Sequence, residues 1–237
     1  MFFQKKAEFT RFDAGIDDMM SAPNPRLTDR ARSGGARHPV KRIVDVVLAS
    51  TALALLSPVI MLILIAVALD GGPAFFGHRR IGRFGKNFNC LKFRSMVVDS
   101  QRALNDLLAR DPRAAAEWAA TQKLRHDPRI TTIGRFLRVT SLDELPQLIN
   151  IIRGDMSLVG PRPIVEAEIS RYGHAFQHYL SVRPGLTGAW QISGRSDVTY
   201  AQRVRLDTEY ALGWSIWGDL RIMMMTVPAV VLRRGSV

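Results

Sequence analysis

Cysteine and acidic residues are both scarce in this chain. Cys90 is the only cysteine among 237 residues, which excludes an intramolecular disulfide and a multi-cysteine metal site. Asp and Glu together number 21 against 33 Lys and Arg, so the formal net charge is +12. The missing disulfides are typical of a reducing compartment, and the excess of positive charge predicts an anionic partner.

The sequence also lacks the signatures of several classes of protein. The glycine-rich residues 82–86 do not have the spacing of a phosphate-binding P-loop. His174 and His178 have no third ligand or intervening Glu beside them, which argues against a zinc site. No helix-turn-helix, zinc-finger or RNA-binding signature accompanies the positive charge, so we do not expect nucleic acid as a partner.

Residues 1–38 mix charged residues with Pro, Gly and Ser and show no sustained apolar period, so we expect a mobile, basic N-terminal arm. Asp13, Asp17 and Asp18 occupy the positions where a secretory signal would have its apolar region, so we do not expect this segment to be a secretory signal. A basic cluster then leads into an apolar run, and this arrangement favours contact with anionic lipid headgroups over a solvated tail. The cluster consists of Arg26, Arg30, Arg32, Arg37, Lys41 and Arg42.

The apolar run, residues 46–69, contains no charged side chain and is long enough for a helix to cross a bilayer. Ser57-Pro58 lies at its middle, where proline removes a helix hydrogen bond and can break the helix. Basic residues on both flanks keep both ends cytoplasmic under the positive-inside rule. These features fit a re-entrant helix-break-helix over residues 39–70, hinged at Ser57 and Pro58, with a spanning helix as the simple alternative and a buried core helix as a third.

Residues 71–237 have the pattern of a mixed α/β, mostly helical domain. We expect a strand over residues 88–96 and a helical segment over residues 100–124 that breaks at Asp111-Pro112. A short strand or turn is expected at residues 129–138. The apolar, methionine-rich residues 214–232 look interfacial or core-packed. Leucines and isoleucines at helical spacing predict one buried helix face, made of Leu142, Leu145, Leu148, Ile149 and Ile152.

Two adjacent carboxylates, Asp143 and Glu144, are the first candidates for chemistry. Ser141-Leu-Asp-Glu144 matches a capping box, which would place both acids in the first turn of that helix. Neighbouring residues point in different directions, so one carboxylate could attack phosphorus while the other holds a divalent metal. From this dipeptide alone, two ordinary capping acids remain the alternative.

Basic side chains that could bind phosphate occur at four places in the sequence. Arg162 stands in a rigid Gly-Pro-Arg-Pro turn, and its planar guanidinium suits a phosphate. Lys92 and Arg94 alternate along a predicted strand and would point to one face. The remaining candidates are Arg79 and Arg80, beyond the apolar run, and Arg195, in a glycine-rich loop. With the acids and the apolar run, these residues describe a phosphate site at a membrane surface, although each alone also fits a solvated surface.

Five features together resemble the bacterial sugar transferases, the polyprenyl-phosphate sugar-1-phosphate transferases with a single re-entrant membrane helix. They are KRIVDVVLA, the Ser57-Pro58 break, LKFRSM, TSLDELPQLINIIRGDMSLVGPRP and RPGLTGAWQISGR. The resemblance runs from Lys41 to about Val237. Within the family, GHRRIG, GRSDVTYAQRV and VPAVVLRRGSV are most similar to the short galactose-1-phosphate transferases that begin exopolysaccharide repeat units.

The resemblance implies that a small cytoplasmic catalytic domain with amphipathic interfacial helices sits on the bacterial inner membrane. It implies transfer of a sugar-1-phosphate, galactose-1-phosphate ahead of glucose-1-phosphate, from a UDP-sugar to undecaprenyl phosphate. UMP is released and a divalent metal, usually Mg²⁺, takes part. A catalytically silent, basic membrane-surface module is the alternative from another class of protein. Oligomeric state stays open, a homodimer included.

The resemblance also assigns roles residue by residue. Asp143 matches the nucleophile that forms a phospho-aspartyl intermediate, and Glu144 matches the adjacent metal-binding carboxylate. Arg162 matches the phosphate-binding arginine. Lys92 and Arg94 belong to a matched basic motif.

Overall fold

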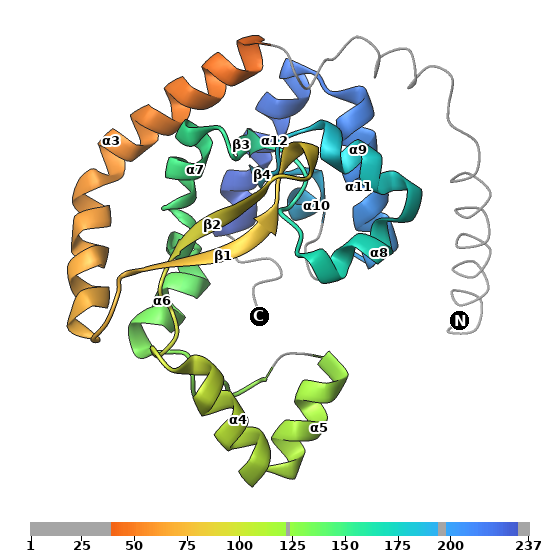
Figure 1. The fold of residues 1–237 in the computed structure, drawn as a ribbon. Helices are drawn as coiled ribbons and strands as arrows, with labels where there is room; N and C mark the ends of the chain where they lie inside the picture. The colour runs from red at the N-terminus through yellow and green to blue at the C-terminus, as the bar shows by residue number, and fades with distance from the viewer. Residues whose placement is uncertain (1–38, 122–123, 194–197, 232–237) are drawn as a thin grey trace, which may run out of the picture.

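A computed structural model describes residues 39–121, 124–193 and 198–231. The chain is mixed α/β and mostly helical, as predicted, and the expected N-terminal arm, residues 1–38, lies outside the described residues. One long helix, α3 (Pro39–Leu69), runs along one side of the domain (Figure 1). Within the described residues, the strands form two small sheets of two strands each.

Helix α3 is continuous through Pro58, so the predicted break into two separate arms is wrong. Figure 1 shows instead a single helix that bends along its course. Pro58 has no N–H to offer the carbonyl of Ala54 four residues earlier. The Ser57 hydroxyl donates to that same carbonyl at 2.8 Å, and this replacement bond allows the helix to continue.

The N-terminal end of α3 is docked onto the rest of the domain. Lys41 is buried, with its Nζ 2.6 Å from Asp219 Oδ2 and 3.1 Å from the Val159 carbonyl oxygen. Arg42 donates to the carbonyls of Ile151 and Ile152 at the end of another helix. Lys41 and Arg42, two members of the basic cluster predicted to contact lipid headgroups, are thus bound to groups of the protein itself.

Two antiparallel strands, β1 (Phe75–Ile81) and β2 (Asn87–Phe93), follow α3. The 3-10 turn η2 (Arg83–Gly85) joins them. Strand β2 confirms the strand predicted over residues 88–96 as far as Phe93, where the strand ends. It packs Cys90 against Leu148 and Ile151, so this small sheet shares the core of the domain.

The next helices agree with the sequence pattern in part. Helices α4 (Ser100–Arg110) and α5 (Pro112–Thr121) confirm the predicted break, and they project from the body as a pair (Figure 1). The prediction of a short strand or turn over residues 129–138 is mostly wrong, because helix α6 (Thr132–Thr140) occupies most of this segment. The Thr131 side chain accepts a hydrogen bond from the Gly134 N–H at 3.0 Å, and this cap begins the helix.

A short 3-10 turn, η3 (Leu142–Glu144), connects α6 to helix α7 (Gln147–Arg153). Strands β3 (Ser157–Val159) and β4 (Gly185–Thr187) then pair in parallel, a sheet that the sequence analysis did not predict. The remaining elements are η4 (Glu166–Glu168), α8 (Ile169–Tyr172), η5 (Gly173–Ala175), α9 (Phe176–Ser181), α10 (Ala189–Ile192), α11 (Tyr200–Gly213) and α12 (Ile216–Val231).

Candidate active site

Asp143 and Glu144, here called the carboxylate pair, lie in the turn η3 and not inside a helix. Ser141 is in the left-handed region at φ 59° and ends α6, and its side chain makes no capping bond to η3. The predicted capping box is therefore wrong. A helix begun at Ser141 would enclose Pro146, whose ring clashes with the carbonyl four residues earlier. Pro146 instead immediately precedes α7.

Lys92, at the end of β2, bridges the carboxylate pair. Its Nζ lies 2.6 Å from Glu144 Oε1 and 3.2 Å from Asp143 Oδ2. Burial lowers the pKa of Lys92, but the carboxylates of Glu144 and Asp143 outweigh burial and the net shift is upward. Lys92 therefore stays protonated and offsets the negative charge of the pair.

Asp143 is the more buried of the two acids. Only 10% of the Asp143 side chain is exposed, whereas 35% of the Glu144 side chain is exposed. Burial raises the pKa of Asp143 and the neighbouring Glu144 adds to the rise, while Lys92 and Arg138 oppose it. The pair thus combines a shielded carboxylate held by cations with a second carboxylate that reaches solvent.

Asn150, on α7, joins this helix to strand β2. Its Oδ1 accepts from the Leu91 N–H at 2.9 Å, and its Nδ2 donates to the Asn89 carbonyl at 2.9 Å. These bonds imitate a further strand at the edge of β2. Sequence reasoning missed Asn150, although a polar residue within an apolar helix face is a visible signal.

The strand register separates the two adjacent arginines. Phe76 pairs with Lys92 and Arg80 pairs with Phe88, and directly opposed residues of an antiparallel pair share a face. Side chains alternate between faces, so Arg80 lies on the same face as Lys92 and Arg79 lies on the other. Of the two arginines, the structure brings Arg80 to the candidate site and leaves Arg79 away from it.

Arg94 does not join Lys92 at the carboxylate pair. Its guanidinium is buried and donates to the Val67 carbonyl at 2.8 Å, near the C-terminal end of α3. The last carbonyls of a helix lack partners within the helix, and an arginine there is stabilising. In this structure Arg94 anchors the long helix, and its predicted alignment with Lys92 toward the phosphate is not seen.

The Gly-Pro-Arg-Pro turn lies beside Arg80. Arg80 Nη1 donates to the Pro163 carbonyl at 3.2 Å. Burial lowers the pKa of Arg80, and the positive charge of Arg162 lowers it further. Arg162 is exposed, with its guanidinium carbon 5.4 Å from the centre of the Trp190 ring. Arg195, the last predicted phosphate-binding residue, lies outside the described residues.

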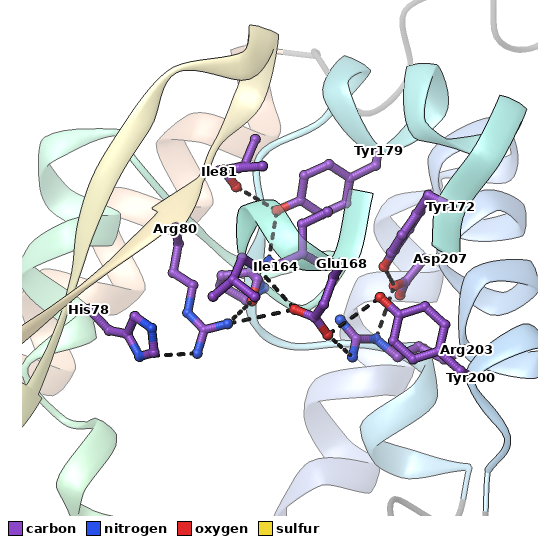
Figure 2. A network of polar contacts seen from close by, with 12 residues as sticks. His78, Arg80, Ile81, Ile164, Glu168, Tyr172, Tyr179, Tyr200, Arg203 and Asp207 are labelled. Carbon is purple, nitrogen blue, oxygen red and sulfur yellow. Dashed lines mark hydrogen bonds and ion pairs between the residues drawn. The ribbon is translucent and has the colours of Figure 1, made fainter. Parts of the chain in front are cut away.

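Further side chains around Arg80 form the polar network drawn in Figure 2, which sequence reasoning missed. His78 Nδ1 lies 3.4 Å from Arg80 Nη2, and Glu168 Oε2 lies 3.8 Å from Arg80 Nη1. Glu168 also contacts Arg203 on α11, with 3.4 Å between Oε1 and Nη1. No local motif marks these residues, because β1, η4 and α11 meet only in the folded chain.

The geometry suits chemistry on a phosphate. A shielded carboxylate stands beside a second one, a lysine bridges both, and arginines on neighbouring elements supply planar donors. The long apolar helix lies along the same domain (Figure 1), and of the described helices it is the one long and apolar enough to cross a membrane.

Comparison with known proteins agrees with this description. Residues 36–233 match the family model described as bacterial sugar transferase. The exopolysaccharide production protein ExoY of Rhizobium meliloti (strain 1021) is 54% identical over 207 residues, which cover 85% of this chain and 92% of ExoY. Undecaprenyl-phosphate galactose phosphotransferase of Salmonella typhimurium is 52% identical over 197 residues, 83% of this chain and 41% of the relative.

A UDP-glucose:undecaprenyl-phosphate glucose-1-phosphate transferase of Escherichia coli (strain K12) is 40% identical over 228 residues, 92% of this chain and 46% of the relative. The chain thus spans nearly the whole of ExoY but less than half the length of the Salmonella and Escherichia proteins. Both the family model and ExoY cover most of its length, and the chain belongs to the bacterial sugar transferase family.

Proposed function

We propose that this protein transfers a sugar-1-phosphate from a UDP-sugar to undecaprenyl phosphate and releases UMP, as the first step of exopolysaccharide synthesis. The observation that carries the proposal is the Lys92 bridge across the carboxylate pair, beside an apolar helix. Relatives named for this kind of reaction share half of the matched residues with this chain. A catalytically silent module would have no need of a shielded carboxylate held by cations.

Asp143 is the nucleophile in this proposal. A carboxylate oxygen of Asp143 attacks the phosphorus that carries the sugar, and the bridging P–O bond of the diphosphate breaks. UMP leaves with the bridging oxygen. An oxygen of undecaprenyl phosphate then attacks the same phosphorus, and the acyl-phosphate bond breaks to restore the Asp143 carboxylate. Lys92 reduces the repulsion between Asp143 and each anionic substrate.

Mg²⁺ is part of the proposal, with Glu144 as its protein ligand. Among the described residues no group of three or more His, Cys, Asp or Glu side chains is placed to hold a metal ion. Mg²⁺ commonly binds through one or two carboxylates together with water and substrate phosphates, and the partly exposed carboxylate of Glu144 fits that mode. When bound, Mg²⁺ would neutralise phosphate charge during the attack.

Galactose-1-phosphate is the favoured group, with glucose-1-phosphate second. The Salmonella relative, named for galactose, is 52% identical, whereas the Escherichia relative, named for glucose, is 40% identical. The proposal for galactose rests on this difference in overall similarity.

A re-entrant α3 in the bacterial inner membrane, with the domain on the cytoplasmic face, completes the proposal. Two observations support it. At the N-terminal end Lys41 binds Asp219, and near the C-terminal end Val67 is buried and accepts from Arg94. A spanning helix places its ends on opposite sides of the bilayer, which is hard to combine with docking of both ends on one domain.

The function is tested by UMP release from the purified, detergent-solubilised chain. The assay supplies Mg²⁺, undecaprenyl phosphate and either UDP-galactose or UDP-glucose, and each component is omitted in turn. We expect release that requires the lipid and the metal and that is faster with UDP-galactose. Release from neither donor would contradict the proposed function, and equal or faster release from UDP-glucose would contradict the choice of sugar.

A further inference from the structure

Three arginines from separate elements lie near one another at the candidate site. Arg80 comes from β1, Arg162 from the turn before η4, and Arg203 from α11, and we call these three the arginine cluster. The guanidinium carbons of Arg162 and Arg203 lie 5.4 and 5.3 Å from the centre of the same Trp190 ring. Burial lowers the pKa of Arg80 most, and the positive charge of Arg162 lowers it next. The two guanidinium groups are therefore close enough to repel each other.

Glu168 is the carboxylate that touches two members of this cluster, as Figure 2 shows. Its Oε2 accepts from the Val165 N–H at 3.0 Å and lies 3.8 Å from Arg80 Nη1. Its Oε1 lies 3.4 Å from Arg203 Nη1 and accepts from the Tyr200 hydroxyl at 3.4 Å. The bond to Val165 ties the carboxylate to its own turn, so Glu168 is itself held in place while it holds the arginines.

Arg203 has donors that none of the described residues uses. Only 10% of its side chain is exposed, and within the described residues its Nε and Nη2 have no hydrogen-bond partner. Asp207 lies 3.8 Å from Nε, beyond hydrogen-bond distance. Buried donors without partners are costly, and a guanidinium in this state is suited to an anion with several oxygens.

We propose that Glu168 is a positioning residue that holds Arg80 and Arg203 in the geometry that binds the diphosphate of the nucleotide sugar next to Arg162. This inference rests on the proposed function, because it takes the donor to be a UDP-sugar. Arg80 connects the two parts of the site, since it shares a sheet face with Lys92 and contacts Glu168 at the other end. This role is separate from that of Asp143, which attacks the phosphorus, and from that of Glu144, which holds the metal.

The sign of the change in affinity distinguishes positioning from simple charge balance. If Glu168 only neutralised the arginines, its removal would leave more positive charge and UDP would bind more tightly. If Glu168 positions them, its removal allows the like-charged guanidiniums to separate and UDP binds more weakly. The two roles therefore predict opposite results for Glu168→Gln, which keeps the shape of the side chain and removes its charge.

The experiment measures UDP binding to the full chain in detergent by titration calorimetry. Glu168→Gln should weaken UDP binding about tenfold, which corresponds to about 1.4 kcal/mol and to the loss of one charge-assisted hydrogen bond. In the turnover assay KM for the UDP-sugar should rise by a similar factor while kcat changes less than about twofold. Glu166→Gln is the matched control, because Glu166 is an exposed acid in the same turn.

A second comparison tests whether Glu168 acts through Arg80. In an Arg80→Ala background, Glu168→Gln should have a smaller effect on UDP affinity, because the part of the effect that acts through Arg80 is lost while the contact with Arg203 remains. Glu168→Asp retains the charge and should recover part of the affinity, and it also serves if Glu168→Gln fails to fold. Unchanged or tighter UDP binding by a folded Glu168→Gln would overturn the inference, as would an equal effect in both backgrounds.

Failure of the function and failure of the inference give different results. If the wild-type chain binds UDP but releases no UMP, the proposed function fails while the UDP comparison still decides the role of Glu168. If the wild-type chain does not bind UDP, both fail.

Discussion

Asp143 and Glu144 are adjacent residues whose surroundings differ, and this difference bears on their chemistry. Asp143 is buried and held by Lys92, whereas Glu144 contacts the same lysine but reaches solvent. A nucleophile benefits from a fixed position, and a ligand of a hydrated cation benefits from access to water. Burial therefore favours Asp143 for the attack on phosphorus and Glu144 for the metal.

Asp143→Asn provides the test of this assignment at the residue scale. The amide keeps the shape of the side chain but is not a nucleophile, so UMP release should fall about a thousandfold or more. Asp106→Asn, at an exposed acid on α4, is the matched control and should leave the rate unchanged. Near-normal activity in a folded, membrane-bound Asp143→Asn chain would rule out Asp143 as the nucleophile.

Asp207 is a second buried acid, and it predicts a pH dependence of stability. Burial raises the pKa of Asp207 from its ordinary value to about 6, although the Tyr172 hydroxyl donates to it at 2.7 Å and opposes the rise. The folded state therefore holds a proton on Asp207 more tightly than the unfolded state does. The contribution of this group to stability is lost as the pH rises from about 4 to about 6.

The corresponding test compares Asp207→Asn with the wild-type chain across this pH range. The variant has no titratable proton at this position. In the wild-type chain, the free energy of unfolding should fall by on the order of 3 kcal/mol between pH 4 and pH 7 because Asp207 loses its proton. Thermal unfolding in detergent at several pH values gives the difference between the two melting temperatures. If that difference stays constant with pH, the folded-state pKa of Asp207 is not raised.

At the scale of elements, Ser57 explains how α3 passes through a proline. Pro58 leaves the Ala54 carbonyl without its usual helix partner, and the Ser57 hydroxyl donates to that carbonyl at 2.8 Å. This bond matters most in lipid, where water cannot substitute for the missing donor. The serine and the proline therefore act as a pair that gives a bent but continuous helix.

Ser57→Ala should destabilise the protein by about 1 kcal/mol, because it leaves the Ala54 carbonyl unpaired. In a Pro58→Ala background, residue 58 regains a backbone N–H that can donate to the Ala54 carbonyl. Ser57→Ala should then lower the stability of the protein much less. Melting temperatures in detergent for the four chains of this cycle measure the coupling. Equal costs of Ser57→Ala in both backgrounds would mean that the hydroxyl does not replace the missing backbone bond.

At the scale of the whole molecule, both ends of α3 contact one domain. The N-terminal end is held by the Lys41 ion pair with Asp219, and the C-terminal end by Val67 packed near Phe93 and Leu137. Between these ends the helix carries many exposed apolar side chains, among them Leu55, Met61, Leu62 and Ile65. The arrangement predicts a helix with one side on the domain, the other in lipid, and both ends on the same side of the membrane.

Cysteine labelling tests this topology. Single cysteines replace Pro39 or Asp70, which flank the apolar part of α3, and the buried Cys90, which packs among apolar side chains, is exchanged for alanine. A membrane-impermeant maleimide should label both positions in inverted inner-membrane vesicles and neither position in spheroplasts. Labelling of the two positions from opposite sides would establish a spanning helix and exclude the re-entrant arrangement.

Local patterns in the sequence sufficed for much of the fold and for the identity of several candidate residues. The uncharged run of residues 46–69 marks α3, and Asp111-Pro112 marks the boundary between α4 and α5, because both depend on neighbouring residues. The motif around Asp143 likewise stands out by its own composition. The capping motif at Ser141 did not predict the local structure, because such a motif does not specify whether its serine ends one helix or begins the next.

What the tertiary structure alone decided depends on contacts between segments distant in the chain. The register of β1 on β2 sends Arg80 toward Lys92 and Arg79 away, and no local pattern contains that register. Arg94 binds the end of α3, and Glu168 joins β1 to α11. The sequence by itself determined which side chains could bind phosphate, because that depends on residue chemistry. Which residues these side chains contact depends on how distant segments of the chain pack together, and only the folded structure specifies that packing.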